Sequence, residues 1–431
     1  MKAEPVREGD PALGWSNASL VVLGSLSAVS FFNYTDRMAV SVLIEPIKQE
    51  LLLSDTEAGL ITGLAFALFY AIMGVPIARL ADRYNKAALL VLCFLLWSGM
   101  TILSGLATSF AMLFILRLLV GVGEAGCLPA SFAIISERFT VSQRPLAISV
   151  FQAGGKLGVA LGTAGAGIAG QILGWRMALI GIGAIGVPVA LIVGLALRGE
   201  SRRVPKQVEV QPRASLKSIL RYPGFVTMII AISFSSFANY GFSQWYPAFF
   251  VRSYGASLGA AGVWIGTATG LGGVVGTIVG GAAAGRLLRR NPNWDLWLPA
   301  ATHALAMPLY LASILSPSLQ ASAGINFVAA LISTSGGGVA LAAFQRFTFT
   351  AHRATANGLM IMISALAGVG LGPVAVGLAS DALAPAFGTE SLRWAMAFST
   401  FAFLGAGFFF LRAARFVHPA SEGLAEDLAA R

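Results

Sequence analysis

The sequence predicts an all-α membrane protein whose twelve transmembrane helices form two pseudo-symmetric six-helix bundles. Of its 431 residues, 56% are hydrophobic and only 11% are charged, whereas a soluble domain carries about 25% charged residues. A soluble fold needs a polar surface that this composition cannot supply. Because one span takes about 20 apolar residues, the length accommodates roughly twelve spans with short loops. The 50 glycines agree with this interpretation, since small residues let membrane helices approach closely.

Long apolar runs bounded by polar, basic or proline-containing segments define the expected spans in chain order. The first six cover residues 17–47, 55–80, 86–107, 109–138, 143–170 and 175–198. The second six cover residues 223–252, 257–287, 295–315, 319–348, 354–384 and 391–416. Each run is long enough to cross the hydrocarbon core as a helix.

Polar segments divide the chain into five parts. We expect a disordered cytoplasmic tail over 1–14, a first bundle over 15–198 and a second bundle over 223–416. Residues 199–222 are rich in basic residues and contain a proline, so they are expected to form a cytoplasmic linker. Residues 417–431 are expected to form a polar cytoplasmic tail.

Basic residues are distributed unequally between the two sides of the predicted spans. Most of them lie in the linker and in the connections that follow the second, fourth, eighth and tenth spans. These connections contain Arg79, Arg83, Lys86, Arg138, Arg144, Arg286, Arg289, Arg290, Arg346 and Arg353. The positive-inside rule therefore places both termini in the cytoplasm, and we expect an integral protein of a bacterial-type inner or plasma membrane. The net charge of +10 then reflects topology and contact with anionic membrane lipids, not a nucleic-acid partner.

Five charged residues interrupt the apolar spans, and all lie in the first half. Asp36 and Arg37 lie in the first span, Arg117 and Glu124 in the fourth, and Lys156 in the fifth. A charge at the bilayer centre costs about 2.5–3.5 kcal/mol on insertion scales, so such residues persist mainly where they pair or line a wet cavity. Arg117 and Glu124 are about two helical turns apart and should face the same way.

These charges predict a proton-responsive site. Burial disfavours the charged form of a carboxylate and a nearby cation favours it, so a proton and Arg117 would compete for Asp36 or Glu124. Arg37 would be their neighbour. Such competition can couple proton movement to a conformational change. The alternative is a set of buried ion pairs that only fixes helix packing.

The second half offers neutral polar and aromatic groups instead. Its seventh span contains Asn239, Tyr240 and Tyr246 as candidate substrate contacts. Arg117 and Lys156 of the first half could contact an anionic headgroup, and the neutral and aromatic residues of the second half could contact a hydrocarbon tail. This arrangement suits an amphiphile with a charged head and a hydrocarbon tail. The alternative is that the second-half residues are ordinary packing surface.

Catalysis and cofactor binding are not expected. The stretch Gly121–Gly126 matches G-x-G-x-x-G, but a dinucleotide site needs a preceding strand, and here the motif lies within an apolar helix. We find no metal-ligand cluster or activated nucleophile, and expect no metal and no cofactor. Cys93 and Cys127 lie in apolar runs and are interpreted as buried free thiols. The chain is expected to act as a monomer.

The loop from Ala78 to Lys86 resembles the signature of the major facilitator superfamily, small-x-x-x-Asp-Arg-x-Gly-basic, with Ala78 and Asn85 replacing its two glycines. The resemblance implies a major facilitator fold. It also implies that Asp82 and Arg83 brace a cytoplasmic gate, with Glu137 and Arg138 as their partners.

Two further stretches, Asn33–Arg37 and Arg117–Cys127, resemble the spinster family of lipid transporters. That resemblance implies a proton-coupled secondary active transporter that works by alternating access and moves a lysophospholipid or a sphingolipid-like amphiphile. A proton-coupled transporter of a small organic anion is the first alternative, because such symporters share the pattern in the fourth span. A membrane-embedded lipid enzyme and a non-transporting receptor are the others.

Overall fold

The computed structural model describes residues 15–140, 142–198, 220–348 and 353–416. Within these ranges the chain forms helices joined by turns and contains no strand. The predicted tails 1–14 and 417–431, and nearly all of the predicted linker 199–222, lie outside the described residues.

The helices overlap every span expected from the sequence. In the first half they are α1 (Asn17–Leu51), α2 (Asp55–Gly59), α3 (Ala65–Arg83), α4 (Lys86–Ser104), α5 (Phe110–Glu124), α6 (Cys127–Arg138), α7 (Arg144–Leu157) and α8 (Thr163–Ala196). In the second half they are α10 (Pro223–Tyr254), α11 (Leu258–Ile265), α12 (Gly272–Leu287), α13 (Trp294–Ile314), α14 (Leu319–Phe344), α15 (Arg353–Ser364), α16 (Leu371–Phe387), α17 (Ser391–Thr400) and α18 (Ala402–Ala413).

Nine helical segments of the described chain are long and apolar enough to cross a membrane. Two of them, 144–196 and 356–416, contain 53 and 61 residues, more than twice the length of about 20 residues that one crossing needs. Within α8, Gly174 has φ 79° and ψ 161°, a conformation open to glycine and outside the helical region. It divides α8 into two helices at the turn that separates two expected spans.

Short polar signals set the helix ends. Ser54 begins α2 with a capping box: its hydroxyl accepts from the Glu57 backbone N at 3.1 Å, and the Glu57 carboxylate accepts from the Ser54 backbone N at 2.8 Å. Asn85 and Ser109 cap α4 and α5 with a single hydrogen bond each, accepted by a side-chain oxygen from a backbone N–H of the first turn. These caps satisfy backbone donors that the first helical turn leaves unpaired.

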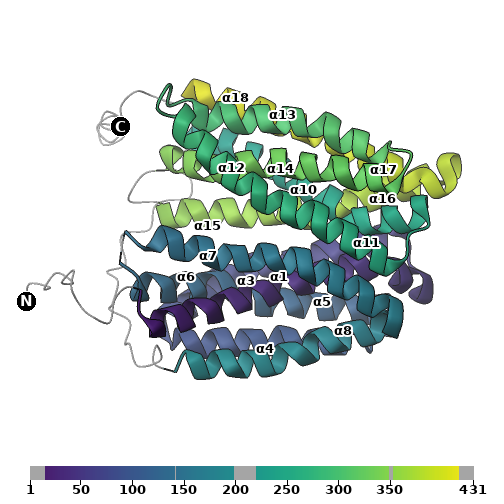
Figure 1. The fold of residues 1–431 in the computed structure, drawn as a ribbon, viewed down its shortest axis with the longest axis horizontal. Helices are drawn as coiled ribbons and strands as arrows, with labels where there is room; N and C mark the ends of the chain where they lie inside the picture. The colour runs from purple at the N-terminus through teal and green to yellow at the C-terminus, as the bar shows by residue number, and fades with distance from the viewer. Residues whose placement is uncertain (1–14, 141, 199–219, 349–352, 417–431) are drawn as a thin grey trace, which may run out of the picture.

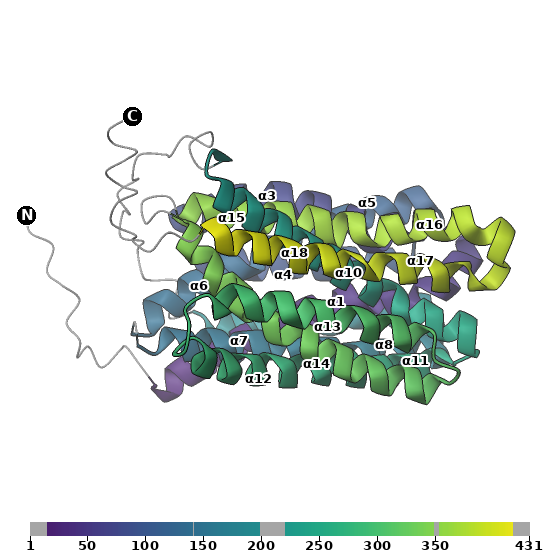
Figure 2. The same cartoon turned by 90° about the horizontal axis from the view of Figure 1, so that it is seen from above.

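The two halves of the chain lie side by side. In Figure 1, α1 to α8 occupy the lower part of the molecule and α10 to α18 the upper part, with α15 along the boundary. The start of α1 and the end of α18 lie at the same end of the helices, which we call the terminal end (Figures 1 and 2). The opposite end, where α1 is followed by α2, is called the distal end.

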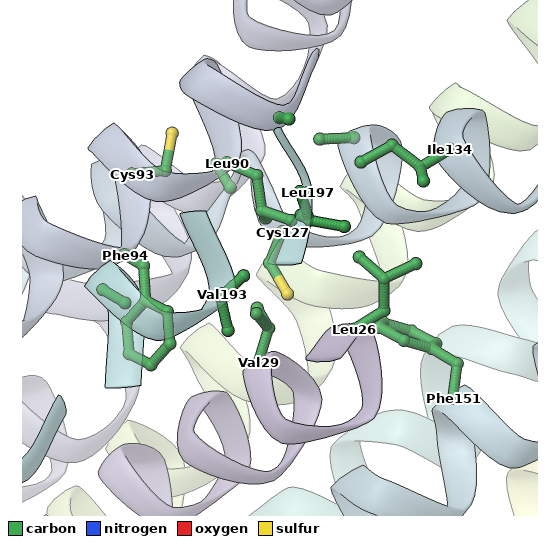
Figure 3. Close-up of a cluster of buried hydrophobic side chains, with 14 of the residues drawn as sticks. Leu26, Val29, Leu90, Cys93, Phe94, Cys127, Ile134, Phe151, Val193 and Leu197 are labelled. Atoms are coloured by element: carbon green, nitrogen blue, oxygen red, sulfur yellow. The ribbon is translucent and has the colours of Figure 1, made fainter. Parts of the chain in front are cut away.

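Each half has its own apolar core. Figure 3 shows part of the first one, where Leu26 and Val29 from α1 face Cys127 and side chains from α4 and α8. Cys93 and Cys127 are both free and buried, as predicted. The second half is richer in aromatic contacts, with Phe242 against Tyr246 and Tyr310.

Glycines and four π-helical turns form the contact between the halves. The turns are Leu60–Leu64, Gly158–Gly162, Gly266–Leu271 and Ala365–Gly370. A Cβ on Gly63 would lie 2.7 Å from the carbonyl oxygen of Gly370, and one on Gly266 would collide with the carbonyl oxygen of Ala160. The backbones therefore touch directly, which requires glycine at these positions.

Gly266→Ala is expected to destabilise the protein by about 1–3 kcal/mol, the usual cost of overpacking, because the new methyl group meets rigid backbone. Gly281→Ala in α12 is the matched control, since a Cβ there has nothing within 4 Å. Thermal unfolding of the purified variants in detergent checks the difference. Equal melting temperatures for the two variants would contradict a close backbone contact at Gly266.

Candidate functional site

A buried ion pair joins α1 to α5 inside the first half. Arg117 Nη1 lies 3.0 Å from Asp36 Oδ2, and the two side chains are 4% and 3% exposed. In a water-poor interior such a pair is stable only with good geometry and with further hydrogen bonds to its remaining polar atoms.

Helix α4 supplies these further hydrogen bonds. Thr101 donates its hydroxyl to Asp36 Oδ1, and Arg117 Nη2 donates to Thr101 Oγ1 at 3.2 Å and to Ser104 Oγ at 3.1 Å. Sequence reasoning did not select Thr101 or Ser104, since neither carries a charge. Ser98, Thr101 and Ser104 recur every three residues on one face of this span, and that spacing was the available signal.

A second pair lies beside the first. Arg37 Nε is 2.6 Å from Glu124 Oε2, and Glu124 is fully buried while the Arg37 side chain is 11% exposed. The Arg37 guanidinium carbon also lies 4.3, 4.9 and 5.4 Å from the ring centres of Phe66, Tyr70 and Tyr34. These distances are within cation–π range.

Arg117 meets Asp36, one of its two expected partners, and the other expected partner, Glu124, meets Arg37. Arg117 and Glu124 share one side of α5 as predicted, but each meets a different residue of α1. Arg117 binds Asp36, and Arg37 rather than Arg117 binds Glu124. Two buried polar atoms, Glu124 Oε1 and Arg117 Nε, have no hydrogen-bond partner among the described residues.

Lys156 in α7 stands apart from both pairs. Within the described part of the chain it has no ion-pair or hydrogen-bond partner for its ammonium group. A Cβ on Gly273 would lie 4.0 Å from Lys156 Nζ, so the side chain reaches toward α12 of the other half. The ammonium group is therefore available to an anionic ligand between the halves.

The candidate contacts of the second half lie in different surroundings. Tyr240 is half-buried and packs against the core of the first half, and Asn239 Nδ2 donates to the Ser235 carbonyl at 3.1 Å. Tyr246 is fully buried, and its hydroxyl lies 2.7 and 2.8 Å from the hydroxyls of Ser313 and Ser322. Tyr246 therefore packs within the second core, and its predicted substrate contact stays a prediction.

A polar network joins the halves at the distal end. Arg252 of α10 binds Asp55 through both terminal nitrogens, at 2.8 and 2.7 Å, and binds Glu45 through Nε at 2.8 Å. Lys48 Nζ lies 2.5 Å from Asp55 Oδ1, and Ser380 donates to Asp55 Oδ2 at 2.6 Å. Neither Arg252 nor any of its partners was selected in the sequence analysis.

Asp381 of α16 completes this network by capping a helix of the other half. Its carboxylate accepts from the backbone N of Asp55 at 3.0 Å and of Thr56 at 2.8 Å, and from the Thr56 hydroxyl at 2.6 Å. A carboxylate at a helix N-terminus is favoured by the unpaired N–H groups and by the helix dipole. We call these contacts of Arg252 and Asp381 the distal latch.

Comparison with known proteins identifies the family. The sequence profile of the Major Facilitator Superfamily matches residues 26–369. The chain belongs to the Major Facilitator Superfamily. It is therefore an integral membrane protein of a transporter family and not an enzyme.

Similar proteins within the superfamily include efflux and spinster-type transporters. An MFS-type efflux pump of Mycolicibacterium smegmatis is 35% identical over 385 residues, covering 87% of this chain and 87% of the relative. Sphingosine-1-phosphate transporter SPNS2 of Xenopus tropicalis is 27% identical over 444 residues, covering 94% and 84%. A solved bacterial homologue of the human lysosomal transporter spinster, inward-facing and unoccupied, superposes with a TM-score of 0.81 at 27% identity, covering 94% of this chain and 100% of that one. The chain thus resembles spinster transporters, as its motifs predicted.

The superfamily loop between α3 and α4 is described only in part. The side chains of Asp82 and Arg83 lie outside the described residues. Their expected partners are described: Glu137 Oε1 lies 2.8 Å from Lys86 Nζ, and Arg138 Nε donates to Ser19 Oγ at 2.9 Å. Both residues also make further contacts.

Proposed function

We propose that this chain is a proton-coupled secondary transporter that works by alternating access and moves a lysophospholipid or a sphingolipid-like amphiphile. The observation that carries the proposal is the pair of buried, adjacent ion pairs between α1 and α5, with one oxygen of Glu124 left without a partner among the described residues. Charges this deep are expensive and mark ion or substrate paths in membrane proteins.

The proposed topology has twelve spans in two bundles, residues 15–198 and 223–416, with both termini and the linker in the cytoplasm. Seven of the nine apolar segments cross the membrane once, and the segments 144–196 and 356–416 cross it twice each. Helix α13 adds one more crossing, which makes twelve spans. The terminal end is then cytoplasmic, and Asp82, Arg83, Glu137 and Arg138 are proposed to form a gate there.

The distribution of contacts between the halves supports alternating access. The distal latch and the glycine contacts hold the halves together at the distal end, and a state closed at this end faces the cytoplasm in the proposed topology. This agrees with the inward-facing relative. Rocking of the two bundles would break the latch and open the distal side.

Proton coupling is assigned to Asp36 and Glu124. Each carboxylate is buried against one arginine, so departure of that arginine would leave an uncompensated buried charge that favours proton uptake. Arg117 and Arg37 hold separate carboxylates, and both pairs join α1 to α5. Protonation would then be tied to the position of α1 relative to α5.

For the substrate, Lys156 supplies a cation without a counter-charge among the described residues, and the half-buried Tyr240, with Asn239 one residue away, offers polar groups on α10. Arg117 is tied to Asp36 and would meet an anionic headgroup only after that pair opens. The availability of Lys156 also supports the second candidate function, transport of a small organic anion with protons. The two functions differ in whether the transported molecule needs a hydrocarbon tail.

Flux into proteoliposomes, with and without an imposed pH gradient, tests the proposal. Lysophospholipids and sphingoid phosphates are compared with small organic anions. Wild-type flux of the lipids is expected to follow the gradient, and Glu124→Gln or Asp36→Asn should carry substrate at a rate independent of pH. Glu50→Gln is the control, because this α1 acid is 49% exposed at the distal end. A normal pH response in both Glu124→Gln and Asp36→Asn would exclude these carboxylates as proton carriers.

A further inference from the structure

The surroundings of Arg37 form a site for a cation that the side chain of Arg37 now fills. Tyr34 lies one turn before it on α1, and Phe66 and Tyr70 lie one turn apart on α3. All three ring centres are within 5.4 Å of the guanidinium carbon. With the Glu124 carboxylate on Arg37 Nε, we call this group of three rings and one carboxylate the cation cage.

The two arginines of the site are held very differently. Arg117 makes an ion pair and two hydroxyl hydrogen bonds, and its side chain is 4% exposed. Arg37 is held to the cage carboxylate through Nε, and its side chain is 11% exposed. Glu124 Oε1 lies buried without a partner among the described residues, so the cage carboxylate can accept a donor that Arg37 does not provide. Arg37 is thus the more exposed of the two cations and makes fewer hydrogen bonds with the described residues than Arg117 does.

We propose that the cation cage binds the ammonium group of an amphiphilic substrate, which displaces the guanidinium of Arg37. Aromatic rings around a carboxylate are a general means of recognising ammonium groups, because the ring faces attract the cation and the carboxylate balances its charge. This inference rests on the proposed transport function and adds a chemical class for the substrate: its polar head carries a positively charged nitrogen. Lipid headgroups and lipophilic amines share this chemistry.

An anionic group on the same substrate has a partner nearby. A Cβ on Gly155 would lie 2.6 Å from the Tyr34 ring, so this wall of the cage touches the turn of α7 that carries Lys156. A zwitterionic headgroup can place its ammonium in the cage and its phosphate toward Lys156.

Three single-chain probes of equal tail length separate the contribution of the ammonium group to binding from that of the phosphate. Dodecyltrimethylammonium carries only the cation, dodecanoyl lysophosphatidylcholine carries both charges, and dodecanoyl lysophosphatidic acid carries only the anion. Equilibrium binding to the full chain in nanodiscs is measured for wild type, for Arg37→Ala, and for Phe66→Leu and Tyr70→Leu in the Arg37→Ala background. Phe398→Leu is the control, because this phenylalanine is 63% exposed on α17.

In the Arg37→Ala background, where no guanidinium occupies the rings, each cage substitution is expected to weaken both ammonium probes by about tenfold, the effect of losing one buried cation–π contact, and to leave lysophosphatidic acid unchanged. Arg37→Ala should strengthen binding of both ammonium probes, since they no longer compete with the guanidinium.

Equal weakening of all three probes, or weaker ammonium binding in Arg37→Ala, would overturn the cage. If lysophosphatidic acid binds and is transported while ammonium is ignored, the cage fails and the transport proposal stands. If none of the probes binds, both proposals fail.

Discussion

Arg117→Ala is expected to lower the free energy of unfolding by about 3–5 kcal/mol and to abolish transport. Removing one partner of a buried pair leaves the other charge uncompensated, and that is the usual cost. Here the orphaned group is Asp36, whose side chain is 3% exposed and would keep its hydrogen bond from Thr101. Thermal unfolding in detergent and flux into proteoliposomes measure the two effects on one preparation.

The double variant Asp36→Asn with Arg117→Met separates stability from function. It replaces the pair by neutral groups of similar size, and such replacements are often neutral or stabilising. The amide oxygen introduced by Asp36→Asn can still accept the hydrogen bond from Thr101. We expect the melting temperature to recover toward wild type while flux stays absent. Recovery of pH-dependent flux would mean that the pair only fixes helix packing, the alternative left open by the sequence.

The fold was largely predictable because the hydrophobic signal of a membrane span is strong. Every expected span overlaps a described helix, and the turn at Gly174 lies where two spans were separated. The charged residues of the site were predictable for the same reason, since a charge within an apolar run is rare. The loop from Ala78 to Lys86 then indicated the superfamily, which the sequence comparison confirms.

The pairing within the site was not predictable. Charge sign favours Asp36 with Arg117 and Arg37 with Glu124, but whether both adjacent residues of α1 reach α5 depends on the rotation of α1 about its axis. A rotation of about 100° exchanges neighbouring residues on a helix, and a single sequence does not specify this angle. Neutral partners such as Thr101 give a still weaker signal, because a hydroxyl in a span can bond to its own helix.

The contacts between the halves were missed for a different reason. Asp381 caps a helix that lies more than 300 residues earlier in the chain, and local sequence carries no information on such a pairing. Ser54 and Glu57 already form a complete capping box for α2, so nothing in the sequence required a second cap. The distal latch is therefore a property of the assembled bundles.

Asp381→Ala is expected to shift the protein toward a state that is open at the distal end. The carboxylate of Asp381 accepts two backbone N–H groups and one hydroxyl from the other half, and these bonds exist only while the halves are together. A hydrogen bond to a charged group contributes about 1.5–3 kcal/mol. Losing even one such contribution would change the ratio of closed to open molecules by about ten- to hundredfold. Arg252→Ala should act in the same direction, because it frees Glu45 and Asp55 of the opposite half.

Spin labels on Leu106→Cys and Leu315→Cys report this change as a distance between the halves. Both leucines are exposed near the distal end, at 53% and 48%, while the two native cysteines are buried. Arg393→Ala is the control, since its partner Glu390 belongs to the same half. A longer distance in Asp381→Ala and Arg252→Ala, but not in Arg393→Ala, would assign distal closure to the latch. An unchanged distance in both latch variants would instead assign closure to the glycine contacts around Gly63 and Gly266, which neither substitution touches.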